Sequence, residues 1–483
     1  MRAYLLILLF FVSCQKSIDP QFEESNFPVE VEKIIINKCA TTGCHNDKSF
    51  QNAANLNLRS WSKMLQGGVG GSVVIPYFLD QSSLFQFVNT YSNLGLIATP
   101  TMPLNAPILS TDEVLIIKNW IENGCRNKSN ELPFQQNYAN RKKGYICNQG
   151  CDLVSVIDVE TNLVIRYVKV GHDPIAIELP HAIKTSKDGK YWYVCFNAGS
   201  YFQKFDAQTD SLISETFIGT GNWNVIGISP DDNTAYISDL ASNGKLAVVN
   251  LQTMQIQTTI GGSGLLTSPH GIALTKTGDT IYVSAQYGNM IYRVIPSIPQ
   301  IDKISIEKGK APVTTPQLKD PHEIVMSPDF SKYFITCEAS NEVVVMDAKT
   351  DTILKTIPVG IYPKAMAYSK NRNWLFVTCQ EDNSILYPTL KVKGTVYVID
   401  MNTLNVVKIL DEKFYQPHGI AIDDRANKLF VVSRNAAPNG PAPHHASGCD
   451  GRNGFFHTID LSTWKVIKRN SELSTDPYNM DIR

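Results

Sequence analysis

A strand–turn–strand pattern recurs through the last 340 or so residues and limits the folds open to this chain more than any other feature. Each copy has an apolar strand, a polar turn and a second strand rich in β-branched and aromatic residues. The copies begin at Ile183, Ile226, Ile272, Ile324, Met366 and Ile420. A second hairpin follows most copies, with an Asp or Asn at the equivalent turn position: Asp158, Asp206, Asn250, Asp347, Asp400 and Asp460.

Four strands in every forty to fifty residues are typical of a β-propeller. Pairing the modules predicts seven blades over residues 142–483. The first blade begins near Gly144 without an innermost strand, and Tyr478–Arg483 has the innermost-strand pattern. We therefore expect the C-terminal strand to complete the first blade and close the ring, which removes exposed edges. The repeats are similar to those of YVTN-type propellers, a resemblance that implies a fold and leaves function open.

The N-terminus has the features of an export signal. Arg2 supplies a positive charge, and Tyr4–Val12 is an apolar run too short to span a bilayer. Ser13-Cys14 at its end resembles the cleavage site of bacterial lipoproteins, which implies a signal peptide over residues 1–14, lipidation of Cys14 and a tether over 15–27. The alternative is an ordinary secretory signal with a chance cysteine. We expect an exported protein, lipid-anchored to a bacterial membrane on its periplasmic or cell-surface side.

The charge balance and the cysteines indicate which partners and which disulfides to expect. The 44 Lys and Arg residues nearly balance 45 Asp and Glu residues, so nucleic acid is not an expected partner. An exported chain permits disulfides, and Cys147 and Cys151 are the expected local pair. Three further cysteines each end an apolar strand, and we expect them to be buried thiols: Cys195, Cys337 and Cys379.

Before the repeats, Cys39, Cys44 and His45 stand in the string NKCATTGCHN. Two cysteines with a histidine directly after the second are typical of covalent haem attachment. The thiols bond to the porphyrin, and the adjacent imidazole binds the iron. Met102-Pro103 follows, and then a capping-box start at Ser110 opens an amphipathic helix.

Residues 28–126 therefore resemble a class I cytochrome c, in particular the short lipoprotein-borne haem domains. The resemblance implies a small all-α domain with one covalent haem c on Cys39 and Cys44, and His45 and Met102 as the iron ligands. A thioether opposite an imidazole raises the haem potential, which suits electron transfer. The spacer departs from the usual pattern, with four residues between the cysteines in place of two. The alternatives are a Cys39–Cys44 disulfide with an incidental His45, and a Met102 that only packs in the core.

Four blades begin with a Pro-His pair, and the equivalent positions in the other three hold Asn224, Lys364 and Tyr478. We expect these seven side chains to form one ring at a mouth of the central channel. The four histidines are His181, His270, His322 and His418. Imidazoles gathered there could hold copper or another transition metal, and His444 and His445 lie in a last-blade insertion long enough to cover that mouth. The alternative is that the histidines bond to neighbouring backbone. The ammonium of Lys364 would repel a cation.

The sequence thus predicts a multi-domain chain, in which a small all-α cytochrome c domain and a linker over residues 127–141 precede an all-β propeller. The leading hypothesis is an anchored electron carrier, with the propeller as a docking or catalytic surface for a redox partner that the sequence does not specify. One alternative is a protein- or glycan-binding propeller with the haem domain as an accessory. Another is an oxidoreductase with a second cofactor in the channel. The cytochrome cd nitrite reductases share this domain order and carry a second haem there.

Overall fold

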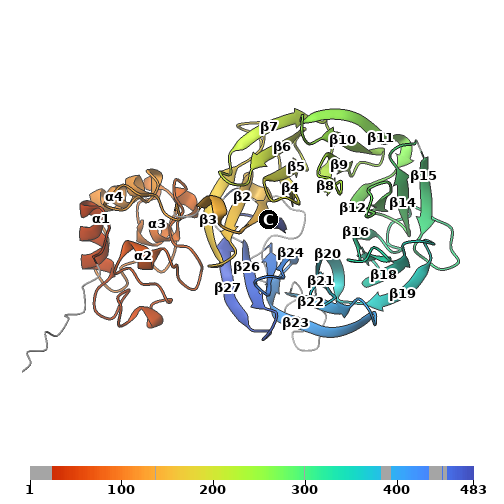
Figure 1. Ribbon diagram of the computed structural model, residues 1–483. Helices are drawn as coiled ribbons and strands as arrows, with labels where there is room; N and C mark the ends of the chain where they lie inside the picture. The colour runs from red at the N-terminus through yellow and green to blue at the C-terminus, as the bar shows by residue number, and fades with distance from the viewer. Residues whose placement is uncertain (1–23, 136–137, 299, 382–392, 435–448, 450–453) are drawn as a thin grey trace, which may run out of the picture.

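The computed structural model describes residues 24–135, 138–298, 300–381, 393–434, 449 and 454–483, and these form a small helical region beside a ring of seven four-stranded antiparallel sheets (Figure 1). The signal segment with Cys14 and the pair His444–His445 lie outside the described residues. Within the described part of the chain, no helix is long and apolar enough to cross a membrane.

The helical region has a core of its own, built from the inward faces of short helices. Ser110 begins the longest of them: its hydroxyl accepts a hydrogen bond from the Glu113 amide, and the Glu113 carboxylate accepts one from the Ser110 amide at 2.8 Å. This is the predicted capping box. The elements are α1 (Val29–Ile34), the π-helical turn η1 (Ile35–Cys39), η2 (Phe50–Asn52), α2 (Trp61–Met64), η3 (Leu79–Gln81), α3 (Ser83–Val88), η4 (Ser92–Leu94) and α4 (Thr111–Glu122).

Each propeller blade is an antiparallel sheet of four strands. After η5 (Tyr138–Asn140), the first blade holds β1 (Lys143–Asn148), η6 (Gln149–Cys151), β2 (Leu153–Asp158) and β3 (Leu163–Lys169). The second holds β4 (Pro180–Thr185), β5 (Tyr191–Phe196), β6 (Tyr201–Asp206) and β7 (Leu212–Phe217). The third holds β8 (Trp223–Ile228), β9 (Thr234–Asp239), β10 (Gly244–Asn250) and β11 (Gln255–Leu266). The fourth holds β12 (Pro269–Leu274), β13 (Ile281–Ala285), β14 (Met290–Ile295) and β15 (Gln300–Ser305).

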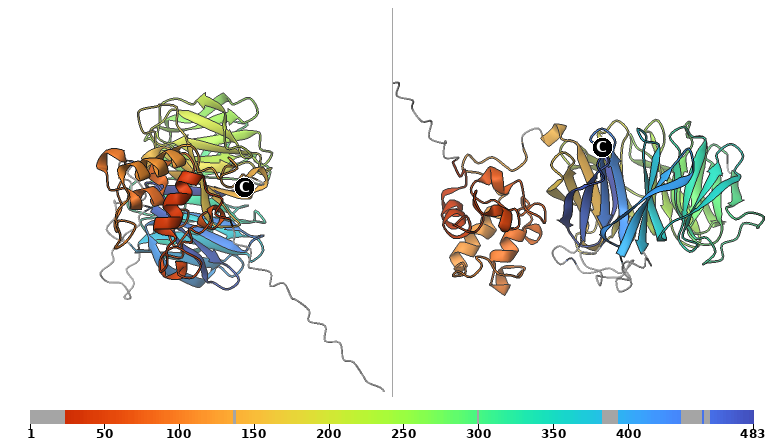
Figure 2. Two further views of the ribbon diagram at one scale, coloured as in Figure 1. Left: turned by 90° about the vertical axis from the view of Figure 1, so that its left-hand side faces the viewer. Right: turned by 90° about the horizontal axis from the view of Figure 1, so that it is seen from below.

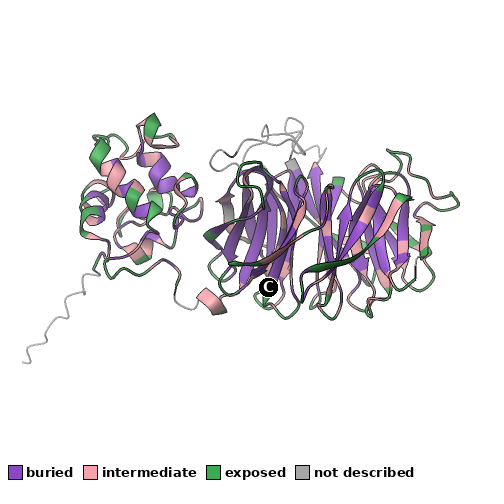
Figure 3. Cartoon of the chain, turned by 90° about the horizontal axis from the view of Figure 1, so that it is seen from above, coloured by how far each residue is buried: buried purple, intermediate pink, exposed green. Residues whose placement is uncertain are grey.

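The remaining blades repeat this order. The fifth holds β16 (Pro321–Met326), β17 (Lys332–Cys337), β18 (Glu342–Asp347) and β19 (Ile353–Pro358). The sixth holds β20 (Ile361–Ser369), β21 (Trp374–Glu381), β22 (Lys393–Asp400) and β23 (Asn405–Tyr415). The seventh holds β24 (Pro417–Asp423), β25 (Lys428–Ser433), β26 (Gly454–Asp460) and β27 (Val466–Leu473), and β28 (Pro477–Ile482) ends the chain. The inner strands of each blade are buried over most of their length, whereas outermost strands such as β7, β11 and β15 and many of the turns are exposed or half-buried (Figure 3).

The C-terminal strand closes the ring, as the sequence predicts. β28 pairs antiparallel with β1, placing Gly144 opposite Ile482 and Asn148 opposite Pro477, so the first sheet runs β28–β1–β2–β3. Every other blade is continuous in sequence. The ring is therefore held shut by main-chain hydrogen bonds between the two ends of the propeller sequence.

The repeated turn residues fix the outer hairpins. The carboxylate of Asp347 accepts hydrogen bonds from the amides of Lys349 and Thr350, both at 2.9 Å. Side chains that bond to backbone two and three residues ahead stabilise tight turns. The same two bonds recur at four other predicted positions: Asp206, Asn250, Asp400 and Asp460.

The helical region packs directly against the first and last blades, beside β3 and β27 (Figure 2). The hydroxyl of Ser72 donates to the carbonyl of Val164 at 2.6 Å, and the Glu472 amide donates to the carbonyl of Gly70 at 3.0 Å. A Cβ on Gly70 would lie 3.2 Å from the Glu472 carboxylate, so a larger residue would crowd this contact. Ile75 is buried within an apolar cluster of the propeller. The two parts of the chain are thus joined by an interface as well as by the linker.

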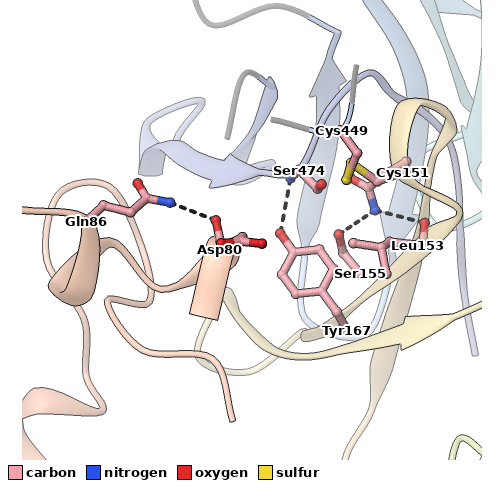
Figure 4. Close-up of a disulfide and its surroundings, with 9 residues drawn as sticks. Asp80, Gln86, Cys151, Leu153, Ser155, Tyr167, Cys449 and Ser474 are labelled. Atoms are coloured by element: carbon pink, nitrogen blue, oxygen red, sulfur yellow. Dashed lines mark hydrogen bonds between the residues drawn. A yellow bond between two sulfur atoms is a disulfide. The ribbon is translucent and has the colours of Figure 1, made fainter. Parts of the chain in front are cut away.

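The disulfide joins Cys151 to Cys449, and the predicted Cys147–Cys151 pair is wrong. Cys147 lies within β1 with its thiol buried between the first two blades, whereas Cys151 lies in the turn after the strand. The bond ties Cys449 to the first blade. Beside it, the Tyr167 hydroxyl accepts a hydrogen bond from the Ser474 amide at 3.1 Å (Figure 4). The prediction of three buried free thiols is confirmed for Cys195, Cys337 and Cys379.

Candidate functional sites

The first candidate site is the turn that holds Cys39, Cys44 and His45. The π-helical turn η1 ends at Cys39, and the chain then folds back so that the His45 amide donates to the Cys39 carbonyl at 3.1 Å. Cys39 is buried in the core of the helical region, while Cys44 and His45 are half-buried. Both cysteines carry free thiols. The alternative disulfide between them is therefore not formed in this structure.

The imidazole of His45 is held in one orientation. Its Nδ1 lies 3.1 Å from the Leu56 carbonyl oxygen, and the Leu58 amide donates to the His45 carbonyl at 2.8 Å. A carbonyl can only accept, so Nδ1 donates this bond, and in the neutral form of the ring Nε2 is the acceptor nitrogen. Metal-binding histidines are commonly oriented by such a bond to backbone.

Met102 packs against the apolar core that contains Cys39, although it lies 63 positions further along the sequence. Its side chain is half-buried, and its amide donates to the Phe87 carbonyl at 2.7 Å. Burial raises the pKa of Cys39 to about 12, with the neighbouring Cys44 as the second cause. A thiol held protonated in this way is a poor free nucleophile. This core and its edge hold two thiols, one imidazole nitrogen and one thioether. That set of groups suits a covalent haem c.

The second candidate site is the ring at the start of the inner strands. One small chamber of about 40 Å³ is lined by Asn224, Tyr478 and the four histidines His181, His270, His322 and His418. The ring centroids of His270 and His322 lie 4.1 Å apart, and those of His418 and Tyr478 lie 3.7 Å apart. The seventh expected member differs, because the ammonium of Lys364 turns to the Glu338 carboxylate at 2.6 Å.

Three of the four imidazoles in the chamber have pKa values lowered by burial. Burial lowers the pKa of His181 to about 3, with His270 as the second cause. Burial and neighbouring histidines also hold the pKa values of His270 and His418 well below their usual range. Two of the rings bond to backbone, His181 Nδ1 to the Asn224 carbonyl at 2.8 Å and His270 Nδ1 to the His322 carbonyl at 3.1 Å. Their Nε2 atoms are therefore acceptors.

Metal binding at this ring stays a prediction. Among the described residues, no three His, Cys, Asp or Glu side chains are grouped as a metal ion would require, and the predicted contributors His444 and His445 lie outside them. A chamber of about 40 Å³ has room for a few water molecules. The side chains that line it leave no space for a second haem inside it.

The sequence did not single out two further channel residues, Glu323 and Lys184. Both border the chamber and also a wider cavity of about 520 Å³ along the rest of the channel. Burial raises the pKa of Glu323 to about 7, opposed by the ammonium of Lys184. The sequence does distinguish Glu323, because it follows a Pro-His pair at the position where the other three Pro-His blades have Gly or Ala.

A third hollow, of about 1120 Å³, lies between the helical region and the first blade. Tyr77–Gln81 lines one side and Gly171–Ile177 the other, with the Cys151–Cys449 disulfide between. Ile175 is 92% exposed at its rim, the highest exposure among the large apolar side chains of the described residues.

No family model matches the chain. It is 29% identical over 203 residues to the uncharacterized protein YncE of Salmonella typhi, covering 41% of this chain and 50% of that protein. It is 28% identical over 219 residues to antigen Lp49 of Leptospira interrogans, covering 44% of this chain and 46% of that protein. The chain thus spans about half the length of the curated relatives that it matches.

Among solved structures, a functionally unknown protein from Desulfotomaculum acetoxidans has a TM-score of 0.50 at 14% identity, covering 69% of this chain and 99% of that one. Hydrazine synthase of Kuenenia stuttgartiensis has a TM-score of 0.46 at 18% identity, covering 61% of this chain and 80% of that one. Taken together, the chain contains a seven-bladed propeller related to YncE and Lp49. At these identities the structural likeness concerns the fold alone.

Proposed function

We propose that this protein is an exported, lipid-anchored c-type cytochrome that carries electrons, with its propeller as a docking surface. In this proposal Cys14 holds the anchor, and Cys39 and Cys44 hold one haem through thioether bonds. His45 and Met102 are the iron ligands. The haem supplies reversible one-electron transfer, and the redox partner is a protein.

The observation that carries the proposal is the state of the Cys39–His45 turn. Two reduced thiols border a half-buried imidazole whose Nδ1 bonds to the Leu56 carbonyl, so that Nε2 is left for a metal. Three other side chains, Val31, Trp120 and Met102, belong to or pack against the core that buries Cys39. In the proposed site that core keeps water from the haem, and such exclusion of water is one way in which proteins tune a haem potential.

The contact between the helical region and the propeller supports a joint role for them. Main-chain and side-chain bonds at Gly70 and Ser72 fix the helical region against the first and last blades. A partner that binds in the hollow between them would touch both. Three exposed apolar side chains line this hollow, Ile175, Ile177 and Tyr77, and apolar surface grouped in this way is suited to burial against a protein partner.

The test is mass spectrometry of the full chain matured in a host that attaches haem c to a four-residue spacer. We expect the added mass of one haem, retained after denaturation, and a low-spin c-type visible spectrum. Cys39→Ala and Cys44→Ala should each leave one thioether bond, and the double variant should carry no covalent haem. Cys125→Ala is the matched control, because Cys125 is a buried free thiol of the same core outside the motif.

Two outcomes would contradict the proposal. One is a wild-type chain of apo mass with a Cys39–Cys44 disulfide. The other is covalent haem that persists in the double variant. If the haem is present but the protein exchanges no electrons with small reductants such as ascorbate, the propeller-binding alternative, with the haem domain as an accessory, becomes the better one.

A further inference from the structure

The central channel has two connected parts. The small chamber inside the histidine ring and the wider cavity of about 520 Å³, called here the funnel, share six lining residues: Lys184, Val225, Ile226, Glu323, Ala365 and Asn479. The histidines of the ring line the chamber alone. The six shared residues therefore mark the place where the chamber opens into the funnel, called here the junction.

The junction holds an ammonium group without a partner. Lys184 on β4 is half-buried, and within the described part of the chain its Nζ has no ion-pair or hydrogen-bond partner. Two other cations near the chamber are balanced. Lys364 pairs with Glu338 at 2.6 Å. Arg434 pairs with Asp476, also at 2.6 Å. The unpaired charge of Lys184 attracts a counterion from solution, because half-buried charges are screened less than exposed ones.

Neutral donors lie on the neighbouring inner strands. Asn479 on β28 accepts a hydrogen bond from the Ile183 amide at 3.1 Å through its Oδ1, which leaves its Nδ2 as a donor at the junction. On β24, neither nitrogen of the buried His418 ring has a partner among the described residues, and a neutral imidazole carries one N–H. The strands β24, β28 and β4 follow one another around the ring. These donors therefore lie on the same side of the channel as Lys184.

One carboxyl group of the junction competes for this ammonium. Glu323 on β16, three blades away from β4, accepts a hydrogen bond from the Met366 amide at 2.8 Å. Burial raises the pKa of Glu323 to about 7, and the ammonium of Lys184 acts in the opposite direction. The protonated carboxyl leaves Lys184 without a countercharge. A bound anion and an ionised Glu323 are thus alternatives.

The funnel has an excess of positive charge. Its charged lining residues in the described part of the chain are Lys184, Lys187, Lys276, Glu323 and Asp481. Three lysines against two carboxyl groups leave one positive charge, or two when Glu323 is protonated. A cavity lined by an excess of one sign concentrates ions of the opposite sign. The funnel therefore favours the approach of an anion to the junction and disfavours that of a cation.

We propose that the channel binds a small monovalent oxyanion, such as a short-chain carboxylate, at the junction of chamber and funnel. The anion accepts hydrogen bonds from the Lys184 ammonium and from Asn479 Nδ2. The acceptor nitrogens of His181 and His270 disfavour a negative charge inside the ring itself. This site is separate from the helical region, so the inference does not depend on the proposed electron carrier.

The test compares three small probes on the full matured chain: formate, formamide and methylammonium. Formate and formamide have nearly the same shape, but only formate is charged. Saturation-transfer NMR and calorimetric titration in a buffer of low ionic strength should show one site for formate. Its affinity should exceed that of formamide about tenfold or more, the ratio that corresponds to about 1.4 kcal/mol. Methylammonium should not bind.

Two channel variants should change formate binding in opposite directions, which a general loss of structure would not do. Lys184→Met removes the ammonium and should weaken binding about tenfold or more, whereas Lys184→Arg keeps the charge and should retain binding. Glu323→Gln removes the competing carboxylate and should strengthen binding at pH 8, where most of this group is ionised. Lys190→Met removes an exposed positive charge outside the channel and should bind formate as the wild type does.

Four outcomes would overturn the proposal. They are equal binding of formate and formamide, preference for methylammonium, no binding of formate, and formate binding that survives Lys184→Met. The last outcome would also place the anion elsewhere, for example on the haem iron. If Lys184→Met does not fold, Glu323→Gln decides, because weaker binding of formate by that variant contradicts a competition between the two anionic groups.

Discussion

Replacing Lys143 with Met should destabilise the propeller strongly, because it breaks a fully buried ion pair. The side chains of Lys143 and Asp210 both have 0% exposure, and Nζ lies 2.8 Å from the carboxylate. The ammonium also donates to two carbonyls at 3.1 Å and lies 3.7 Å from the centre of the Tyr138 ring, in the linker. Burial lowers the pKa of Lys143 to about 8, against the attraction of Asp210.

The magnitude follows from what the variant leaves behind. Asp210 would keep its neutral donors, the hydroxyls of Tyr138 and Tyr145 and the indole of Trp192, but would lose the balancing charge. Removing one partner of a buried pair costs about 3–5 kcal/mol. At roughly 2.1 cal/mol/K of unfolding entropy per residue, a propeller of about 340 residues should then melt about 4–7 °C lower.

Differential scanning calorimetry measures the change, and limited proteolysis of the linker reports the loss of the Tyr138 contact. Lys190→Met is the matched control: the Lys190 side chain is 71% exposed and pairs with Asp188 at the surface. Water and salt screen exposed pairs, which contribute little to stability. A Lys143→Met protein that melts within 1 °C or so of the control would refute the reasoning.

Four other predictions test separate parts of the structure. Met102→Ala should lower the reduction potential of the haem-loaded protein in a redox titration, because the thioether favours ferrous iron; an unchanged potential would mean that another group binds the iron. Deleting Asp476–Arg483 should cause aggregation in size-exclusion chromatography, since β1 loses its paired strand and the blades on either side, at β4 and β24, lose the strand that they pack against. A monomer with unchanged melting would contradict the ring closure. Reducing the Cys151–Cys449 bond, which spans 298 positions, should lower the melting temperature by several degrees, as a disulfide typically contributes about 2–4 kcal/mol; Cys449→Ser should be insensitive to reductant. The pKa of Glu323 is raised from 4.5 to about 7, so the folded protein keeps this proton to a higher pH than the unfolded chain does. The melting temperature of the wild type, relative to that of Glu323→Gln, should therefore fall as the pH rises from about 4.5 to 7 and then level off. If the melting temperatures of the two proteins stay parallel across that range, Glu323 does not titrate in this way.

The sequence by itself determined the propeller. Its repeats are local patterns, a strand, a turn with an Asx side chain and a second strand, and such patterns need only short-range geometry. It also determined the closing strand, because one blade lacked an inner strand and the last six residues supplied it. The capping box at Ser110 was equally local. For the same reason the Pro-His repeats placed four histidines at one level of the channel.

Only the tertiary structure decided how distant segments meet. Cys151 pairs with a cysteine 298 positions away, because the last blade returns beside the first once the ring closes. The raised pKa of Glu323 arises from burial among several blades, which no single repeat encodes. The packing of Ile75 into the propeller likewise depends on the docking of the helical region. Local patterns fix elements, whereas desolvation and long-range contacts exist only after those elements have assembled.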